Sequence, residues 1–595
     1  MYAQFALVIA ATAFISAINA ATLKPTQCAL WLRTPVPPER RFILYRVFNH
    51  IYDPCERGYA AFIGVMVRHS RIMVMLALIV SGLGIYGLTR IPTAFIPIDD
   101  QGYLVMAVQL PEGASLGRTT TSLESATKAA LAVPGVDRVI AISGMSLLDN
   151  SADLFNAGTA YVMLKPFDER LKEKDQDLIG IYTRLQKALA GLPDGKPYVL
   201  PPPAIQGIGN AGGFQMQLEL LGGSNDYAKL GKLTDQITAE AARDPALNNV
   251  FTTYRTAAPE VTLTVDRARA ETLRVSVGDV FATLTGYVGS TYVNQFNKFG
   301  QSYQVFVQAD SQFRQHPEDL LSLYVRSQDG NMVPLGAVAH LGQSVSPPLL
   351  TLYNLYPSAT VIGAPARGYS SGQAMDAMEA IAKRVLPSDV AYEWTGMSYQ
   401  EKITGNQLYY VFGLSLLLVY LVLAAQYESW VLPLAVLGAV PLALLGPVIA
   451  LTALGAANNL YTQIGLMLLI ALSAKNGILI VEVARENRII HGKSIWESAV
   501  EASRLRFRPI LMTSFAFILG VLPLVLATGP GANARRSLGI SVFSGMIAST
   551  LLAVLFVPSY FAVLQAYEEW RKRGKTPKPA PAEPAPPAAP EGAAA

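Results

Sequence analysis

The chain has 595 residues, 51% of them hydrophobic and 15% charged, and its formal net charge at pH 7 is +4. Soluble domains carry about 25% charged residues, so this composition excludes an ordinary soluble protein and indicates an integral membrane protein with one sizeable polar part. The small, dispersed charge predicts no nucleic-acid partner, and the two cysteines, Cys28 and Cys55, and five histidines offer neither a disulfide framework nor metal-ligand spacing.

Seven apolar runs are each long enough to cross a bilayer as a helix. Between the second and the third lies a stretch of ordinary soluble composition, residues 93–400. The sequence therefore predicts a membrane α-helical bundle of about seven spans with one large insert after the second span. The runs lie near residues 3–21, 72–89, 408–425, 431–453, 462–482, 510–528 and 538–564.

Lysine and arginine in the short loops predict the orientation of the bundle. The loops 22–71 and 483–509 and the start of the tail are rich in both residues, so we expect them on the cytoplasmic side. The large insert then lies outside the cytoplasm. The first run is not expected to be a cleaved signal peptide, because basic residues follow it instead of preceding it. The Pro/Ala-rich tail from Lys575 is expected to be disordered.

The large insert shows repeated β-α-β patterns. Such repeats suggest ferredoxin-like subdomains, whereas residues 288–345 are richer in turns, carry the hairpin signal Asp329-Gly330 and are interpreted as an inserted module. The stretch Gly144–Gly158 looks too irregular for a regular element. Strands are expected at Tyr103–Leu110, Val139–Ser143, Phe214–Leu220, Pro259–Val265, Ala359–Gly363 and Ala391–Trp394, and helices at Thr119–Ala132, Tyr227–Ala242 and Gly372–Arg384.

Lys475 lies in the middle of the apolar run 464–481. A charged side chain near mid-membrane costs about 3 kcal/mol on insertion scales, so such a residue normally has a partner charge or a proton path. Glu482 shares its helix face, and Thr513 lies in the next span, with Arg506 near its mouth. One hypothesis is a polar strip that exchanges protons. The alternative is structural: Lys475 bonds a carbonyl and Thr513 bonds back to its own helix.

The apolar residues of the insert admit two interpretations. Most of them alternate along predicted strands, and core packing explains them. Around Gly144–Gly158, however, they could form an adaptable apolar pocket. The sequence contains no Walker lysine loop, nucleophile elbow or paired acid/base constellation. We therefore expect neither an enzyme nor an ATP-driven pump.

Five motifs occur in a specific order: Phe95–Tyr103, Trp394–Glu401, Ala425–Trp430, Leu472–Glu482 and Arg506–Ser514. Together they resemble the permease subunit of resistance–nodulation–division (RND) drug efflux pumps, hydrophobe/amphiphile branch, over nearly all of residues 1–570. The resemblance implies a proton-driven antiporter of the bacterial inner membrane with no cofactor beyond the proton gradient. It implies hydrophobic or amphiphilic small-molecule substrates, a homotrimer, a periplasmic adaptor protein and an outer-membrane channel.

Family members are about twice as long as this chain and consist of two similar halves. This chain resembles the sixth helix followed by the whole second half. An incomplete gene product, a split pump completed by a separate N-terminal chain and an independent half-size protein all stay open, as does a non-transporting scaffold or receptor. The implied division is a span at 1–21, a cytoplasmic loop at 22–71, a span at 72–92, porter subdomains at 93–287 and 346–400, a docking module at 288–345, a five-helix bundle at 401–566 and a cytoplasmic tail at 567–595.

The resemblance also implies site residues. Lys475, Thr513 and Arg506 match the relay positions of this half, but the two intramembrane aspartates that pair with the lysine in the family have no counterpart here. The resemblance assigns two further sets of residues to substrate binding. One set lines a deep drug pocket and switch loop, and the other lies on a strand that lines an outer pocket. The first is Ile140, Ile142, Met145, Leu147 and Tyr161, of which only Tyr161 keeps an aromatic ring, and the second is Phe214, Met216 and Leu218.

Overall fold

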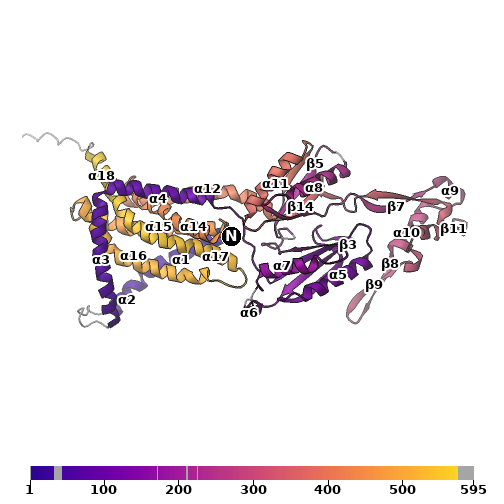
Figure 1. The fold of residues 1–595 in the computed structure, drawn as a ribbon, viewed down its shortest axis with the longest axis horizontal. Helices are drawn as coiled ribbons and strands as arrows, with labels where there is room; N and C mark the ends of the chain where they lie inside the picture. The colour runs from indigo at the N-terminus through magenta and orange to yellow at the C-terminus, as the bar shows by residue number, and fades with distance from the viewer. Residues whose placement is uncertain are drawn as a thin grey trace, which may run out of the picture.

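A computed structural model describes residues 2–32, 43–170, 172–173, 175–209, 212–223 and 225–573. The described chain is elongated: helices gather at one end, two α/β layers lie in the middle, and a group of β-ribbons and short helices forms the opposite tip (Figure 1). The tail from Lys575 lies outside the described residues.

The described residues contain seven helical segments that are long and apolar enough to cross a membrane, which confirms the predicted number. The last of them is interrupted by a π-helical turn at Ser549–Ala553. The helices of this region are α1 (Tyr2–Ala21), α2 (Leu23–Trp31), α3 (Ile43–Arg68), α4 (Ser70–Arg90), α12 (Gly396–Tyr427), α13 (Pro433–Leu437), α14 (Ala439–Leu454), α15 (Leu460–Ile489), α16 (Ile495–Val525), α17 (Ala532–Ala548) and α18 (Val554–Arg573).

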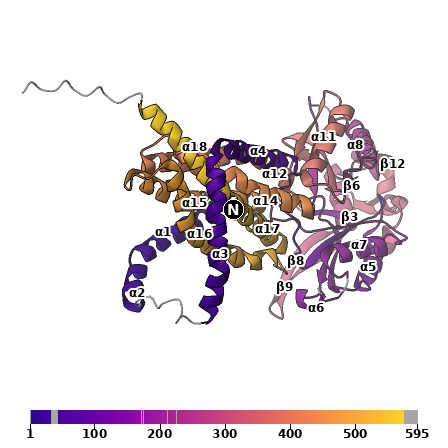
Figure 2. The ribbon, with the colours of Figure 1, turned by 60° about the vertical axis from the view of Figure 1, so that its left-hand side comes forward.

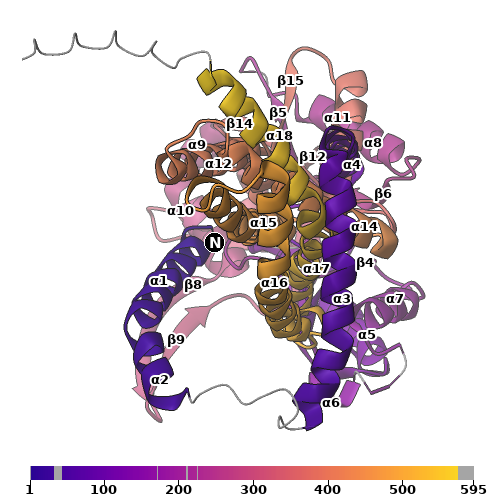
Figure 3. The same cartoon turned by 90° about the vertical axis from the view of Figure 1, so that its left-hand side faces the viewer.

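Small residues bring the central helices of the bundle close together. A Cβ atom on Gly446 of α14 would lie 2.1 Å from the backbone oxygen of Ser544 on α17, and one on Gly545 would lie 2.4 Å from the side chain of Leu469 on α15. Close backbone approach of this kind favours helix association in lipid. By contrast, α1 and α2 lie apart from these helices, as Figures 2 and 3 show.

Helix α3 is absent from the sequence prediction, which assigned residues 22–71 to a loop. Its buried residues Tyr52, Ile63, Met66 and Val67 recur at helical spacing on one face. This face packs against α16 and α18. The loop prediction rested on the many basic residues of the segment, and the two whose side chains are described on α3, Arg57 and Arg68, are exposed.

The first α/β sandwich has one antiparallel sheet in the order β2-β3-β1-β4. Helices α5 and α7 cover one face of it (Figure 1), and the core between them contains Leu104, Met106, Leu123 and Ile181. The elements follow one another as β1 (Tyr103–Gln109), α5 (Leu116–Leu131), β2 (Val136–Ser146), β3 (Ala152–Leu164), α6 (Phe167–Arg170), α7 (Leu178–Leu189) and β4 (Lys196–Leu200).

The second sandwich repeats this plan with a large insertion. Its antiparallel sheet has the order β13-β14-β5-β15, with β6 paired to β14, and α8 and α11 supply the helical layer. The sequence prediction missed β6. The strand predicted at Pro259–Val265 exists but leaves this sheet. The elements are β5 (Phe214–Leu220), α8 (Tyr227–Ala241), β6 (Leu247–Thr252), β13 (Thr351–Tyr353), β14 (Tyr356–Pro365), α11 (Ser371–Val385) and β15 (Val390–Trp394).

The insertion forms the tip of the molecule. β7 (Ala258–Val265) and β12 (Ala339–Ser346) pair over eight residues each and carry the tip away from the sandwiches (Figure 1). The hairpin at Asp329-Gly330 is confirmed, because β10 and β11 pair across it. The tip contains α9 (Arg267–Thr272), α10 (Val277–Leu284), a π turn at Thr285–Gly289, β8 (Thr291–Lys298), β9 (Gln301–Val307), β10 (Tyr324–Arg326), β11 (Met332–Pro334) and three short 3-10 turns at Ser311–Phe313, Pro317–Ser322 and Leu335–Ala337.

Two junctions connect these parts. The sandwiches meet at a small apolar cluster in which the ring of Tyr198 stacks on Phe251 with centroids 4.0 Å apart. The bundle is tied to the segment that leads into β1: the backbone nitrogen of Leu460 donates to the oxygen of Phe95 at 2.9 Å, and the Asn533 amide donates to the oxygen of Ile98 at 2.7 Å. The first turns of α15 and α17 are therefore fixed to the α/β region.

Candidate functional site

Lys475 lies halfway along α15, on a face that the rest of the described chain leaves open. Its neighbours Ser473, Ala474, Asn476 and Gly477 are all buried, whereas Lys475 itself is exposed. Among the described residues, the ammonium group makes no hydrogen bond or ion pair. The structural alternative, in which the lysine bonds a carbonyl, is therefore not what the described chain shows.

The buried side of the same helix carries a cluster of polar side chains. The hydroxyls of Ser473 and Ser549 lie 2.8 Å apart, and Ser473 also donates to the backbone oxygen of Ala439 at 3.3 Å. The amide nitrogen of Asn476 is buried and has no hydrogen-bond partner among the described residues. The polar residues of α15 thus point in two directions, with Lys475 on the outer side.

Several other charges of the bundle, near the end of α15, form ion pairs within the chain. Near the end of α15, Arg488 binds Glu569 of α18 with two contacts of 2.8 and 2.9 Å. Glu568 accepts a hydrogen bond from Ser429 at 2.8 Å and pairs with Lys572 at the same distance. These charges lie at one end of the bundle and are paired within the chain.

The structure does not join the other two predicted relay residues to Lys475 by a hydrogen bond or ion pair in the described part of the chain. Thr513 is exposed, and its hydroxyl donates to the backbone oxygen of Ile510 at 3.1 Å, as the structural alternative expects. Arg506 is half-buried, and its Nε atom is enclosed without a hydrogen-bond partner among the described residues. Their relay role stays a prediction.

The predicted deep-pocket residues lie on the face of the first sheet that α5 and α7 leave uncovered. Ile140 and Ile142 are 52% and 38% exposed on β2, and Ile140 pairs directly with Tyr161 of β3. The ring of Tyr161 lies 6.3 Å from that of Tyr103 on β1. Three of the five residues therefore form one apolar, accessible surface.

Met145 and Leu147 are half-buried at the end of the β2–β3 hairpin. The expectation that Gly144–Gly158 is irregular was wrong: β2 continues to Ser146 and β3 begins at Ala152. A register shift between Ser143 and Met145 lets the strand bend, and the hydroxyl of Thr159 donates to the backbone oxygen of Met145 at 2.9 Å. This bend, with polar Asn150 and Ser151 in the turn, hid the strand period in the sequence.

Phe214, Met216 and Leu218, for which the resemblance implies a strand lining an outer pocket, lie in the core of the second sandwich, and the pocket role stays a prediction. They are 1%, 0% and 0% exposed and pack beneath α8 and α11 in the core of the second sandwich. Alternation along β5 puts all three on the helix-covered face, so as placed here they support the fold. Phe214 alone also borders a cavity of about 220 Å³ between the sandwiches and the bundle.

That cavity contains a residue to which the sequence analysis assigned no role. Glu401 lies in the first turns of α12, lines the cavity, and accepts a hydrogen bond of 2.7 Å from the hydroxyl of Ser371 at the start of α11. The carboxyl group of Glu401 thus connects α12, a helix of the bundle, with α11, a helix of the second sandwich. Its presence in the motif Trp394–Glu401 was the only sequence signal.

β5 also carries a buried carboxyl group, that of Glu219. Burial raises the pKa of Glu219, and the nearby charge of Glu393 raises it further, while a hydrogen bond from Asn354 acts in the opposite direction. This group therefore holds its proton more readily than an exposed glutamate does.

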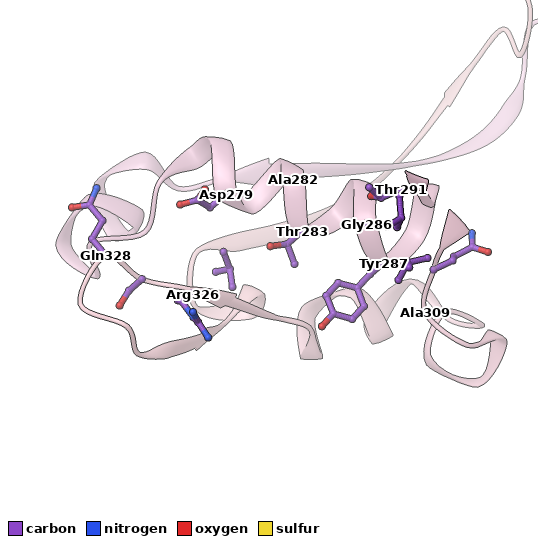
Figure 4. A pocket seen from close by; sticks show the side chains of 14 residues that line it. Asp279, Ala282, Thr283, Gly286, Tyr287, Thr291, Ala309, Arg326 and Gln328 are labelled. Atoms are coloured by element: carbon purple, nitrogen blue, oxygen red, sulfur yellow. The ribbon is translucent and has the colours of Figure 1, made fainter. Parts of the chain in front are cut away.

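A larger cavity, of about 810 Å³, lies in the tip, at the far end of the molecule from α15. Asp279, Thr283 and Tyr287 line it from the α10 side and Arg326 and Gln328 from the β10 side (Figure 4). Among the described residues, no group of three or more His, Cys, Asp or Glu side chains could hold a metal ion.

Comparison with known proteins gives consistent matches along the chain. The model of the AcrB/AcrD/AcrF family matches residues 1–565. The toluene efflux pump membrane transporter TtgB of Pseudomonas putida is 38% identical over 574 residues, and the multidrug export protein AcrF of Escherichia coli (strain K12) is 39% identical over 574 residues. Each alignment covers 95% of this chain and 54% of the relative. The chain therefore spans about half the length of the curated relatives it matches.

Proposed function

The chain belongs to the AcrB/AcrD/AcrF family, and from this premise we propose that it provides the lysine-bearing part of a proton-coupled efflux transporter for hydrophobic and amphiphilic compounds. The relatives are named as efflux transporters of toluene and of multiple drugs, so a transporter is favoured over an enzyme. The proposed setting is the bacterial inner membrane, with the α/β region on the periplasmic side.

The open face of α15 carries this proposal. Lys475 is a cation at mid-span with no carboxylate partner among the described residues. Because an unpaired charge at this depth is costly, we propose that its partners are carboxylates on polypeptide that corresponds to the remaining half of the relatives. Protons that bind those carboxylates would weaken their hold on the lysine, and α15 would then shift.

The contacts between the bundle and the α/β region offer a route for that shift. Leu460 begins α15 and donates to Phe95, Asn533 lies at the start of α17 and donates to Ile98, and α12 follows directly from β15. A movement of these helices would pull on the segment before β1. Moving one charge across 100 mV supplies about 2.3 kcal/mol, enough to shift a two-state equilibrium by tens of fold.

We infer that the two sandwiches are ferredoxin-like porter subdomains and that the tip is a docking module. The support is the order β-α-β-β-α-β in both sandwiches and the matching strand orders. The open face with Ile140, Ile142 and Tyr161 is the proposed substrate surface, since apolar, adaptable surfaces suit varied ligands. A homotrimer, a periplasmic adaptor and an outer-membrane channel are the proposed partners.

Drug-dependent proton flux in proteoliposomes tests the proposal. The chain is reconstituted with and without a supplied polypeptide for the remaining half, as wild type, as Lys475→Ala and as the matched control Lys187→Ala, which removes an exposed lysine from α7. We expect flux only from the complete assembly. Lys475→Ala should abolish most of this flux, whereas Lys187→Ala should leave it at the wild-type level. Wild-type flux from Lys475→Ala would refute the coupling role. Binding of drugs without any flux would favour a non-transporting scaffold or receptor.

A further inference from the structure

One side of β6, and of the residue that follows it, faces the first sandwich. Asn249, Phe251 and Thr253 alternate along the chain, so their side chains point in the same direction. The amide of Asn249 donates a hydrogen bond of 3.3 Å to the hydroxyl of Tyr182 on α7, and the ring of Phe251 stacks on Tyr198 of β4. The second sandwich therefore contacts the first at several points along a single strand.

The contact at the Thr253 end passes through a carboxyl group. Asp149 lies in the turn between β2 and β3 of the first sandwich. One of its oxygens accepts a hydrogen bond of 2.7 Å from the hydroxyl of Ser146 in the same hairpin. The other oxygen accepts one of 2.5 Å from the hydroxyl of Thr253 in the second sandwich. A single side chain thus ties the turn of this hairpin to the neighbouring sandwich.

A second carboxyl group, that of Glu112, lies beside this contact. Glu112 is half-buried and, together with Asp149 and the buried Asn156, it lines a cavity of about 20 Å³ between the two sandwiches. A cavity of this size has room for about one water molecule. The charged and titratable side chains around it are those of Glu112, Asp149, Tyr254 and Arg255. Two carboxyl groups therefore share one arginine.

This arginine forms no ion pair with either carboxyl group in the described part of the chain. One terminal nitrogen of Arg255 donates instead to the backbone oxygens of Thr252 at 3.2 Å and Tyr254 at 2.9 Å. Two carboxylates close to one small cavity repel each other, and a proton on one of them removes that repulsion. The site is therefore built to hold a proton.

The surroundings of Glu112 raise its pKa. Burial is the largest cause, and the nearby charge of Asp149 adds to it. A hydrogen bond from Asn156 and the charge of Arg255 act in the opposite direction. Arg255 and Leu349 of the second sandwich line the cavity and supply part of the burial. Separation of the sandwiches would return Glu112 to water, and its pKa would fall, because burial outweighs the lost charge of Arg255.

From this arrangement we infer that Glu112 is a proton-binding site between the two sandwiches, and that its protonation holds them together beside the contact of Asp149 with Thr253. Contact is favoured fully below the pKa that Glu112 has when the sandwiches are apart. This contribution is lost as the pH rises through the higher pKa of Glu112 in the closed arrangement. The ligand is a proton from the solution around the α/β region, and the inference does not depend on whether the protein transports anything.

Distances between the sandwiches, measured by pulsed electron paramagnetic resonance, test the inference. The full chain carrying Cys28→Ser and Cys55→Ser has no native cysteine. Thr121→Cys on α5 and Gln236→Cys on α8 then place one spin label at an exposed position of each sandwich. We expect one short distance in acid and a longer one whose share grows as the pH rises. The ratio of the two populations should change by up to about tenfold per pH unit for one linked proton.

Two variants and a control decide the outcome. Glu112→Gln imitates the protonated group and should give the short distance at every pH, whereas the control Glu124→Gln, which removes an exposed carboxyl group from α5, should keep the pH dependence. Thr253→Val should increase the share of the longer distance at each pH.

A distance distribution that stays constant with pH in the unsubstituted sandwiches would overturn the proton-binding site. So would a pH dependence that persists in Glu112→Gln, or a long distance in this variant at every pH. An unchanged distribution in Thr253→Val would overturn the part assigned to the contact with Asp149.

Discussion

The α/β region and the membrane bundle each contain a basic side chain where a charge is costly, and the two regions differ in whether that charge has a partner. Arg170 is fully buried in the first sandwich, and it pairs with Asp100 at 2.5 Å, donates to the backbone oxygens of Lys165 and Gln176, and lies over the ring of Phe167. Lys475 is exposed at mid-span without a partner in the described chain. The buried charge of the first sandwich is thus paired within that sandwich and the segment leading into it, whereas the charge of α15 faces outward with no described partner.

The largest expected effect is on Arg170. In Arg170→Ala, Asp100 loses its partner, and we expect the α/β region to lose about 3–5 kcal/mol of unfolding free energy. Chemical denaturation followed by tryptophan fluorescence measures this. The control Arg138→Ala removes an exposed arginine that pairs with the adjacent Asp137, which is worth at most about 1 kcal/mol. Similar losses from both variants would contradict the comparison.

A second substitution separates the core of the second sandwich from the open face of the first. Met216→Ala should cost about 2–5 kcal/mol, because Met216 is fully buried beneath the helices. Ile142→Ala should cost less than about 1 kcal/mol, since Ile142 is 38% exposed. The same denaturation experiment compares them. If Met216→Ala changed drug binding but not stability, the placement of β5 would be wrong.

In the bundle, removal of the basic side chain is expected to raise stability and not to lower it. In the chain alone, Lys475→Met removes an unpartnered charge that faces lipid, and we expect the bundle to gain about 2–3 kcal/mol of stability in bicelles. Lys475→Arg keeps the charge and should give no gain. Unfolding by increasing detergent fraction provides the measurement. A loss of stability in Lys475→Met would reveal a stabilising partner for the lysine within the chain.

The smallest effect is the pH dependence of the sandwich at Glu219. Since burial raises the pKa of this carboxyl group, the folded state is favoured while the group is protonated. That contribution is complete below the unfolded pKa and is lost as the pH rises through the folded pKa. Glu219→Gln should therefore stabilise the α/β region near neutral pH and make no difference in acid. A constant difference at all pH values would contradict this assignment.

Much of the fold could be predicted because its signals are local. The seven spans follow from long apolar runs, and α5 follows from its helical period and the Pro134-Gly135 stop just after it. β6 was missed because Leu247–Thr252 contains two asparagines and little alternation. Helix α3 was missed because charged residues, Pro54 and Gly58 interrupt a pattern that only packing against α16 makes coherent.

The candidate site was predictable in its residues but not in their directions. A lysine in a long apolar run can be recognised as a candidate site residue from the sequence alone. The sequence of α15 does not indicate which face of the helix the remaining helices cover. The same limit applies to Phe214, Met216 and Leu218. Their alternation along β5 fits a pocket wall and a core equally well, and only the positions of α8 and α11 decide for the core.

The paired strands β7 and β12 have a mechanical consequence. Both strands connect to the second sandwich. Their eight successive residue pairs show no register shift, so they form one continuous two-stranded ribbon, about 27 Å long at strand spacing. If a ribbon of this length rotates as a rigid body, each degree of rotation at the sandwich displaces its far end by about half an ångström. A tilt of the second sandwich by several degrees would therefore displace the tip by several ångströms.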